Sequence, residues 1–213
     1  MEQNNTKQLI GIALKLLAIC TIVAVIVALV YSVTKDRIDL NEKVNTAQAL
    51  DGIYSEEYSG LSFSVSDTEN SPAFVMKDAD GNTVISCDEA KTELISDVTA
   101  LYVINDADGN TVSYCVSVAP MGFKDTINML VAVNPDVSVK GVKIVSMSET
   151  SGIGTKAAEP EFLEKFNGLG SPVSSKVDTI SGATKTSKPV IGAVDTALRQ
   201  TAEYIKSNGG LSQ

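Results

Sequence analysis

The stretch Leu101–Val118, LYVINDADGNTVSYCVSV, decides the fold. Two runs rich in β-branched and aromatic residues flank Asp108-Gly109, and an Asp-Gly pair between such runs is a strong signal for a tight β-hairpin. The seven residues DADGNTV around this turn also occur earlier, at Asp78–Val84. The repeat therefore predicts two similar hairpins and, with them, an antiparallel sheet.

Other runs of the same kind extend the predicted sheet. They are LSFSV (61–65), PAFVM (72–76), INMLVAV (127–133) and VKGVKIV (139–145). In the last run the apolar positions shift register at Gly141, which predicts a β-bulge. Helices are expected at Glu159–Phe166 and from Pro189 onward. The expected fold class is α+β, with one N-terminal transmembrane helix followed by a twisted, mostly antiparallel sheet and packed helices.

The repeated turns leave two alternatives open. A calcium-binding loop also contains closely spaced Asp residues, although it takes a longer acidic series that ends in a chelating Glu. Cys87 and Cys115 lie at the same distance after their turns. The two thiols would pair if the hairpins are neighbours in an oxidising compartment, and small buried free thiols are the alternative.

The composition excludes several kinds of site. Among the 213 residues there is no His, which removes Ser-His and Cys-His catalysis, His-ligated haem and most zinc sites. Three cysteines are fewer than the four thiolates of a usual iron–sulfur cluster. A net charge of -9 without a basic stripe argues against a nucleic-acid partner. We expect neither a catalytic residue nor a metal site.

An apolar run, Leu9–Tyr31, contains only Lys15 and Thr21 as polar interruptions. Because a bilayer takes about 20 such residues, the run predicts a retained single-pass helix over residues 9–33. A cleaved signal peptide has a shorter apolar core, and a buried core helix is the other alternative. Residues 1–8, 34–60 and 61–213 then form an N-terminus, a stalk and a folded domain. Lysines on both sides of the span leave its orientation open.

A glycine-containing loop follows the last predicted strand. Gly152-Ile153-Gly154 with Ala157 fits a loose dinucleotide-binding fingerprint, but the βαβ units of such a site are absent. The glycines also suit a tight strand-to-helix turn that needs positive φ. A third interpretation is a loop whose bare backbone lies against a flat or anionic ligand.

The stretch Val177–Val190, VDTISGATKTSKPV, leads into the C-terminal helix. Apolar spacing from Pro189 predicts the helix and makes Thr186 or Ser187 its N-cap. SGATKTS would then lie at the positive end of the helix dipole, where anions bind, and Lys185 adds a cation. Ser and Thr residues before a helix are usually caps, and this is the first interpretation of the segment. No basic residue activates Thr184, so we expect no nucleophile there; the alternative is that its hydroxyl is a group on which another enzyme acts.

Taken together, these features resemble the FMN-binding domain family, and in particular the G subunit of the Rnf ion-translocating electron-transport complex. The C subunit of sodium-pumping NADH:quinone oxidoreductase is a relative. The resemblance rests on the N-terminal span, the Gly122-Phe123 turn, the Glu149–Gly154 loop and the Asp178–Ser187 segment. Ser151, Met147 and Asp125 depart from the family pattern, which has Pro, often His, and Gly at these positions.

The resemblance implies a covalent cofactor: a flavin transferase that uses FAD joins FMN through its phosphate to the hydroxyl of Thr184. Gly152 and Gly154 would let the backbone approach the isoalloxazine, and Lys156 would place positive charge near the reduced ring. The implied cofactor-binding residues are Glu149, Thr150, Gly152, Ile153, Gly154, Lys156, Asp178, Ser181, Gly182, Ala183, Thr184, Lys185, Thr186 and Ser187.

The implied function is that of a membrane-anchored electron-transfer subunit in an Rnf-type ferredoxin:NAD oxidoreductase. Such a subunit passes electrons between other integral and peripheral subunits and turns over no substrate alone. The implied location is the cell membrane, with the N-terminus in the cytoplasm and the C-terminal domain on the extracytoplasmic side. A free-standing surface flavoprotein and a non-redox anchored binding module are the alternatives.

Overall fold

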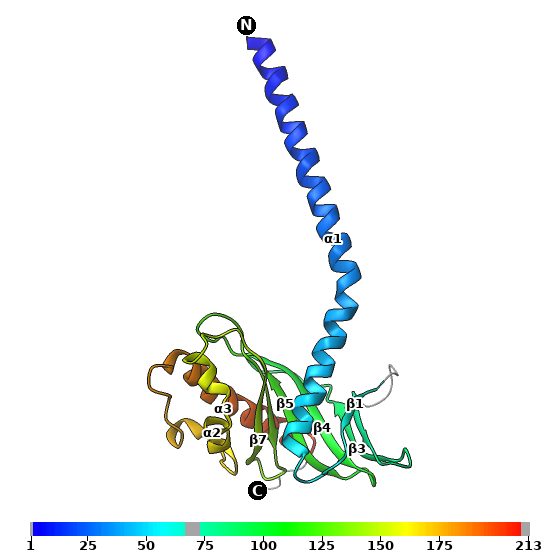
Figure 1. Ribbon diagram of the computed structural model, residues 1–213, viewed down its shortest axis with the longest axis vertical. Helices are drawn as coiled ribbons and strands as arrows, with labels where there is room; N and C mark the ends of the chain where they lie inside the picture. Colours follow the sequence, from blue (N-terminus) through cyan, green and yellow to red (C-terminus); the bar gives the residue numbers. More distant parts are fainter. Residues whose placement is uncertain (1, 67–72, 210–213) are drawn as a thin grey trace. The chain divides into compact units, whose positions relative to one another are not determined.

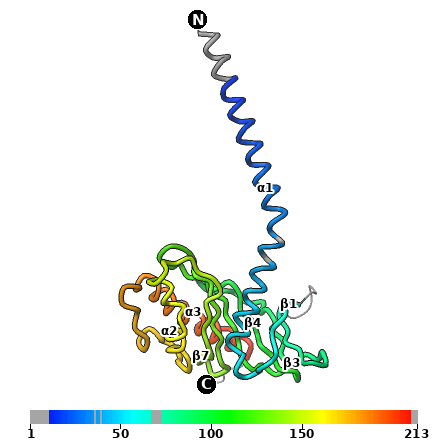
Figure 2. Tube along the Cα trace, viewed as in Figure 1, coloured from blue at the N-terminus to red at the C-terminus, as the bar shows by residue number. Residues whose placement is uncertain are grey.

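The computed structural model describes residues 2–66 and 73–209, with the side chains of 2–10, 36 and 39 left aside (Figures 1 and 2). The chain divides into two compact units, Met1–Lys43 and Val44–Gln213, and each is described by itself. Pro72, the first residue of the predicted run 72–76, lies outside the described residues, as do residues 67–71 and 210–213 of the predicted domain.

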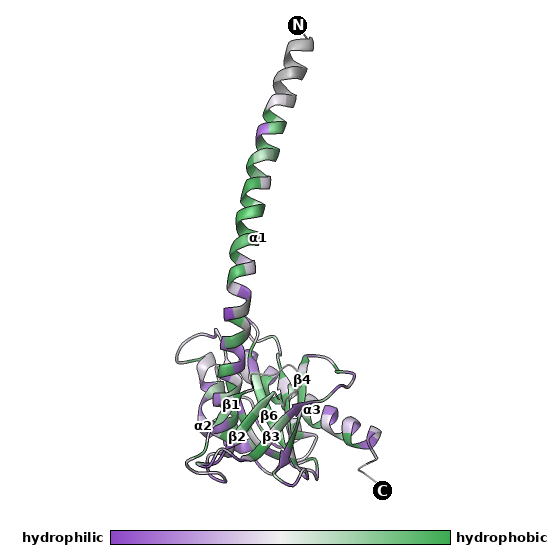
Figure 3. Cartoon of the chain, turned by 90° about the vertical axis from the view of Figure 1, so that its right-hand side faces the viewer, coloured by the Kyte–Doolittle hydropathy of each residue, from purple (hydrophilic) through white to green (hydrophobic). Residues whose placement is uncertain are grey.

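The first unit is helical. Helix α1, Glu2–Tyr54, provides all of its described residues and continues into the second unit. The large apolar side chains between Ile12 and Val33 are exposed. The ribbon of α1 is coloured as mostly hydrophobic over its middle part in Figure 3. Within the described ranges, α1 is the one helix that is long and apolar enough to cross a membrane. The expected N-terminal apolar helix is therefore present.

The second unit is built on a seven-stranded sheet in which every neighbouring pair is antiparallel and the strands follow sequence order. The strands are β1 (Phe63–Val65), β2 (Phe74–Lys77), β3 (Thr83–Glu89), β4 (Val98–Asp106), β5 (Thr111–Val118), β6 (Asn128–Val133) and β7 (Val139–Ser146). The predicted α+β fold class is confirmed. β3 was absent from the predicted runs, although a hairpin at Asp78–Val84 requires it.

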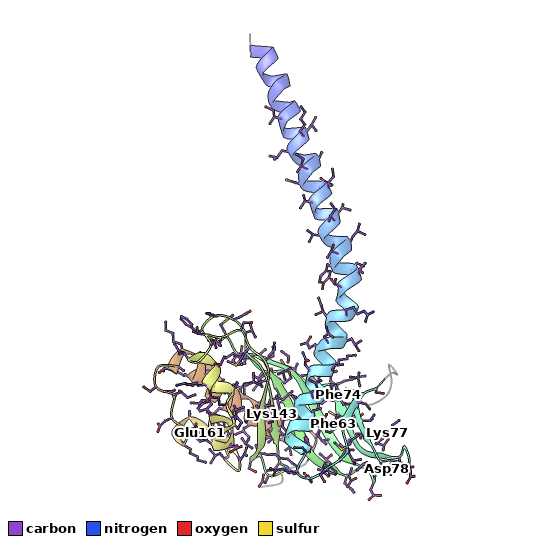
Figure 4. The ribbon with its side chains drawn as sticks, in the orientation of Figure 1. Phe63, Phe74, Lys77, Asp78, Lys143 and Glu161 are labelled. Atoms are coloured by element: carbon purple, nitrogen blue, oxygen red, sulfur yellow. The ribbon has the colours of Figure 1, made fainter. Side chains whose placement is uncertain are left out.

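Both DADGN stretches form the predicted hairpin turns. Gly81 and Gly109 have φ of 85° and 83°, a conformation that glycine adopts without strain. In each turn the first Asp accepts backbone N–H bonds from residues two and four positions later, within 3.0 Å. Asp78, labelled in Figure 4, directly follows β2 and opens the β2–β3 turn. The bulge is also confirmed, since Lys140 is the extra residue beside Gly141 in β7.

The two cysteines do not pair, which answers the disulfide question. Cys87 lies in β3 and Cys115 in β5, both thiols are free and buried, and β4 separates them. Strands two places apart lie about 9.5 Å from each other, beyond the Cα separation that a disulfide spans. Burial raises the pKa of the Cys115 thiol to about 12 and also raises that of Cys87.

The sheet has a buried core on each face. One core holds the end of α1, where Ala47, Leu50 and Tyr54 face the sheet at helical spacing. Residues 44–54 thus belong to the second unit, whereas the sequence predicts a stalk over 34–60. The other core holds helix α3, Thr184–Ser207, and the short helices after β7. These are η1 (Gly154–Ala158), α2 (Pro160–Leu163), η2 (Glu164–Phe166) and η3 (Val173–Ser175).

Polar side chains fix α3 on its face of the sheet. The amide of Gln200 accepts from the N–H of Ile95 and donates to the carbonyl of Glu93, at 2.8 and 3.0 Å. The carboxylate of Asp195 accepts from the N–H groups of Val173 and Ser174. The Gln200 bonds attach α3 to the β3–β4 connection, and the Asp195 bonds attach it to η3 in the long connection before α3.

Candidate functional site

Three segments far apart in the sequence meet at one end of the sheet. In an antiparallel sheet that follows chain order, the β5–β6 connection and the loop after β7 lie at the same end. The first is the turn at residues 120–127 and the second is the loop at 147–153, which leads into η1. The first turn of α3 joins them through side-chain contacts.

The carboxylate of Glu149 connects these segments. Oε1 accepts from the backbone N–H groups of Phe123 and Lys124 at 2.8 and 3.0 Å. Oε2 accepts from the hydroxyl of Thr186 at 2.9 Å. Burial of this side chain, which is 9% exposed, would raise its pKa, but the hydrogen bonds from these donors and from the backbone of Asp125 outweigh burial, and the pKa is lowered. Glu149 is therefore a buried carboxylate that stays ionised at neutral pH.

Two glycines make room for this carboxylate. A Cβ at Gly122 would lie 2.4 Å from Oε1 of Glu149, and one at Gly154 would lie 2.8 Å from Oε2. The absent side chain of Gly154 thus admits Glu149, where the resemblance implied an approach to the flavin ring. Gly152 differs, because its φ of 72° favours glycine while a Cβ there would meet open space. The dinucleotide interpretation of this loop is wrong, because an antiparallel sheet contains no βαβ unit.

Helix α3 begins earlier than the sequence predicts. Its first residue is Thr184, its N-cap is Ala183, and Pro189 lies inside the helix. Thr186 and Ser187 are therefore not caps. The Thr186 hydroxyl donates to Glu149, and the Ser187 hydroxyl donates to the Ala183 carbonyl and accepts from the N–H of Ile180. Pro189 costs the helix only the bond to the carbonyl of Lys185, close to its open end.

The Thr184 hydroxyl differs from its two buried neighbours. Thr184 is exposed, and in the described part of the chain no residue hydrogen-bonds its side chain. The backbone N–H groups of Thr184 and Lys185 likewise have no acceptor among the described residues. Unpaired N–H groups at a helix start attract anions. The first turn of α3 therefore presents a free hydroxyl beside unpaired N–H groups that can bind a phosphate.

Two neighbouring hollows share Phe123, Thr184 and Lys185 in their walls. The smaller, of about 420 Å³, is otherwise lined by Glu149, Thr150, Ile153, Gly154, Gly182, Ala183 and Thr186. The larger, of about 700 Å³, adds Gly122, Lys188 and Pro189. The Lys185 ammonium lies 5.1 Å from the centre of the Phe123 ring. Both volumes lie in the range of small-molecule sites.

The structure brings together most of the implied site residues but not all of them. Asp178, Ser181, Gly152 and Lys156 are exposed and line neither hollow, and Ser187 is buried behind the helix start. Phe123, which was not among the site residues, lines both hollows and is 56% exposed. A large aromatic left in solvent is the signal for such a site, but exposure is not visible in sequence.

Comparison with known families agrees with this location. Residues 122–199 match the model of the FMN-binding domain. This match confirms the resemblance to the FMN-binding domain family. The matched range includes the Phe123 turn, the Glu149 loop and the start of α3, which are the three segments that meet at the hollows.

A curated relative of this chain is a subunit of an oxidoreductase complex. The chain is 32% identical over 92 residues to the G subunit of the proton-translocating ferredoxin:NAD(+) oxidoreductase complex of Clostridium ljungdahlii. The match covers 39% of this chain and 50% of the relative, so the chain spans about half the length of the relative it matches.

Two solved structures are also similar. NqrC of Shewanella oneidensis is 25% identical, with a TM-score of 0.40, over 49% of this chain and 61% of that one. The C subunit of the Na(+)-translocating NADH-quinone reductase of Parabacteroides distasonis is 24% identical, with a TM-score of 0.42, over 54% and 63% of the two chains.

Proposed function

We propose that this protein is a membrane-anchored electron-transfer subunit that carries FMN, joined through its phosphate to the hydroxyl of Thr184. The observation that carries the proposal is the state of that hydroxyl. It is exposed and unbonded among the described residues, whereas the hydroxyls of Thr186 and Ser187 are engaged. It lies within the range that matches the FMN-binding domain.

The helix start fits the phosphate. A phosphate joined to Thr184 would keep one negative charge beside the free N–H groups of Thr184 and Lys185. Lys185 and Lys188 line the adjoining hollow, and neither forms an ion pair with a described carboxylate. A partly positive helix end and two available cations favour a monoanionic ester.

The hollows also fit a flat, largely apolar ring. Phe123 and Ile153 are 56% and 51% exposed and both line the smaller hollow, so together they present apolar surface to a ligand there. A ring between them would remove apolar surface from water. FMN would supply the capacity to accept and donate electrons, and the residues around it would bind and orient it.

Covalent attachment suits the location that we propose. Helix α1 would anchor the protein in the membrane, with the second unit on the extracytoplasmic side. A cofactor tied to Thr184 is not lost by dissociation there. A flavin transferase that uses FAD would attach it: the Thr184 oxygen bonds to the phosphorus of the FMN half, the pyrophosphate bond of FAD breaks, and AMP leaves while the hydroxyl proton is lost. As in the complex named for the Clostridium relative, the electrons would pass to and from other subunits of an Rnf-type ferredoxin:NAD oxidoreductase.

The attachment is tested with threonine variants of the full chain, coexpressed with a flavin transferase. Thr184→Val should abolish in-gel flavin fluorescence, because valine keeps the shape and lacks the oxygen. Thr184→Ser should retain it. Thr179→Val, an exposed neighbour outside both hollows, is the matched control. Fluorescence that survives in Thr184→Val would overturn the proposal.

Membership of a complex is tested separately. The protein is purified in mild detergent from its own host, and the accompanying proteins are identified by mass spectrometry. Several integral membrane subunits should copurify in fixed ratio with the flavin-bearing chain. A flavin-bearing protein that purifies alone would instead be a free-standing surface flavoprotein. A chain without flavin would be a non-redox binding module.

A further inference from the structure

We propose that Glu149 is a positioning residue for flavin attachment, and that its charge also lowers the reduction potential of the flavin. The resemblance implied a cofactor contact at this position. In the structure the Glu149 carboxylate instead accepts hydrogen bonds from three donors of the protein itself. This inference rests on the proposed function.

The positioning role follows from the connections that Glu149 makes. Its three donors lie 25, 26 and 37 residues away along the chain. Oε1 accepts two backbone N–H groups, which uses both of its lone pairs. Gly122 and Gly154 leave the space that the carboxylate occupies. The packing is therefore built around this side chain.

What Glu149 holds in place is the geometry of both hollows. On one side it fixes the backbone of Phe123, which lines both of them. On the other it fixes Thr186, two residues after Thr184 in the first turn of α3. The separation between the Phe123 ring and the Thr184 hydroxyl thus depends on one carboxylate. Small displacements at a reacting group cost large factors in rate.

The charge of Glu149 has a second consequence. The carboxylate is part of the wall of the smaller hollow and is held ionised by its donors. A fixed negative charge beside a flavin opposes the addition of electrons, because reduction builds up negative charge on the ring. Low polarity around a buried group strengthens this effect. The potential of the bound flavin should therefore be lower than it would be beside a neutral side chain.

Glu149→Gln separates position from charge. The side-chain carbonyl of Gln can accept bonds from both N–H groups. Its NH₂ group can donate to the Thr186 hydroxyl, which then becomes an acceptor instead of a donor. Attachment by the transferase should stay within about threefold of the parent, while the midpoint potential of the flavin should become more positive. Glu149→Ala removes all three bonds and should slow attachment by about tenfold or more. Glu161→Gln, on the exposed side of α2, is the control for both readouts.

Thr186→Val provides a second variant that keeps the size of the side chain and the charge of Glu149. It should slow attachment, and Thr186→Ser should restore it, while neither should raise the potential. Parent-like attachment in both Glu149→Ala and Thr186→Val would overturn the positioning role. An unchanged potential in Glu149→Gln would overturn the electrostatic role. If the parent itself carries no flavin, the proposed function fails. Melting temperatures of the unflavinylated variants then still test whether Glu149 holds the three segments together.

Discussion

The carboxylates of Asp106 and Glu149 both accept backbone N–H hydrogen bonds, but their donors lie at different distances along the chain. Asp106 accepts N–H bonds from Asp108 and Asn110, two and four residues later, in an exposed turn, and Asp78 does the same in the twin turn. Glu149 accepts from residues 25 to 37 positions away and is buried. The hydrogen bonds to Asp106 lower the pKa of that carboxyl, and those to Glu149 lower the pKa of Glu149.

The difference shows which carboxylate organises the molecule. Asp106 closes a loop that its own sequence already favours, since Asp-Gly turns form locally. Glu149 holds together three segments that have no local reason to meet. Loss of a local bond affects one turn, whereas loss of the long-range bonds affects the packing of the site and its hollows. Melting temperatures of full-chain variants in detergent test this contrast.

The largest effect is expected for Glu149→Ala. It leaves two N–H groups and one hydroxyl without their acceptor, and hydrogen bonds to charged groups contribute about 1.5–3 kcal/mol each. Because Phe123 and Lys124 can regain water, we expect a net loss of about 3 kcal/mol, or about 6–12 °C in melting temperature. A melting temperature equal to that of the parent would show that Glu149 does not organise the domain.

A smaller effect is expected for Gly154→Ala. The new Cβ would lie 2.8 Å from Oε2 of Glu149 and 3.1 Å from the Thr186 hydroxyl oxygen, so both must move. Overpacking of this kind costs about 1–3 kcal/mol. The matched control is Gly192→Ala in α3, where a Cβ meets nothing within 4 Å and alanine favours the helix. Equal melting temperatures for the two variants would contradict this account of Gly154.

The smallest effect is expected for Asp106→Ala. The turn loses its side-chain bonds to Asp108 and Asn110. The bond from the Gly109 N–H to the carbonyl of residue 106, and that from the N–H of residue 106 to the Asn110 carbonyl, are backbone contacts and remain available. The melting temperature should be hard to distinguish from that of the parent, and flavin attachment should be unchanged. A loss as large as that of Glu149→Ala would remove the contrast between local and long-range carboxylates.

The same contrast explains what the sequence could predict. The DADGN turns, the bulge beside Gly141 and the apolar helix all depend on residues close in the chain, and each was predicted correctly. The start of α3 was placed too late because Pro189 signals a first turn only when local preference decides. In the structure the helix already includes Thr186, whose hydroxyl bonds to the distant Glu149, a contact that local preference does not reveal.

Other features of the site required the three-dimensional arrangement. Cys87 and Cys115 share a spacing after identical turns, but successive turns at one end of such a sheet place an intervening strand between them. The family resemblance named Glu149 and Gly154 without revealing that the glycine makes room for the glutamate. It also left Phe123 out of the site residues, because its exposure depends on the fold.

The central claim is that the Thr184 hydroxyl carries FMN, and one measurement tests it directly. Protein purified from its own host is digested with trypsin, which releases the peptide Val177–Lys185, and the peptide is mapped by tandem mass spectrometry. The account predicts an added mass equal to FMN less one water, located on Thr184 and not on Thr179 or Ser181. An unmodified peptide, or flavin on another residue, would contradict it.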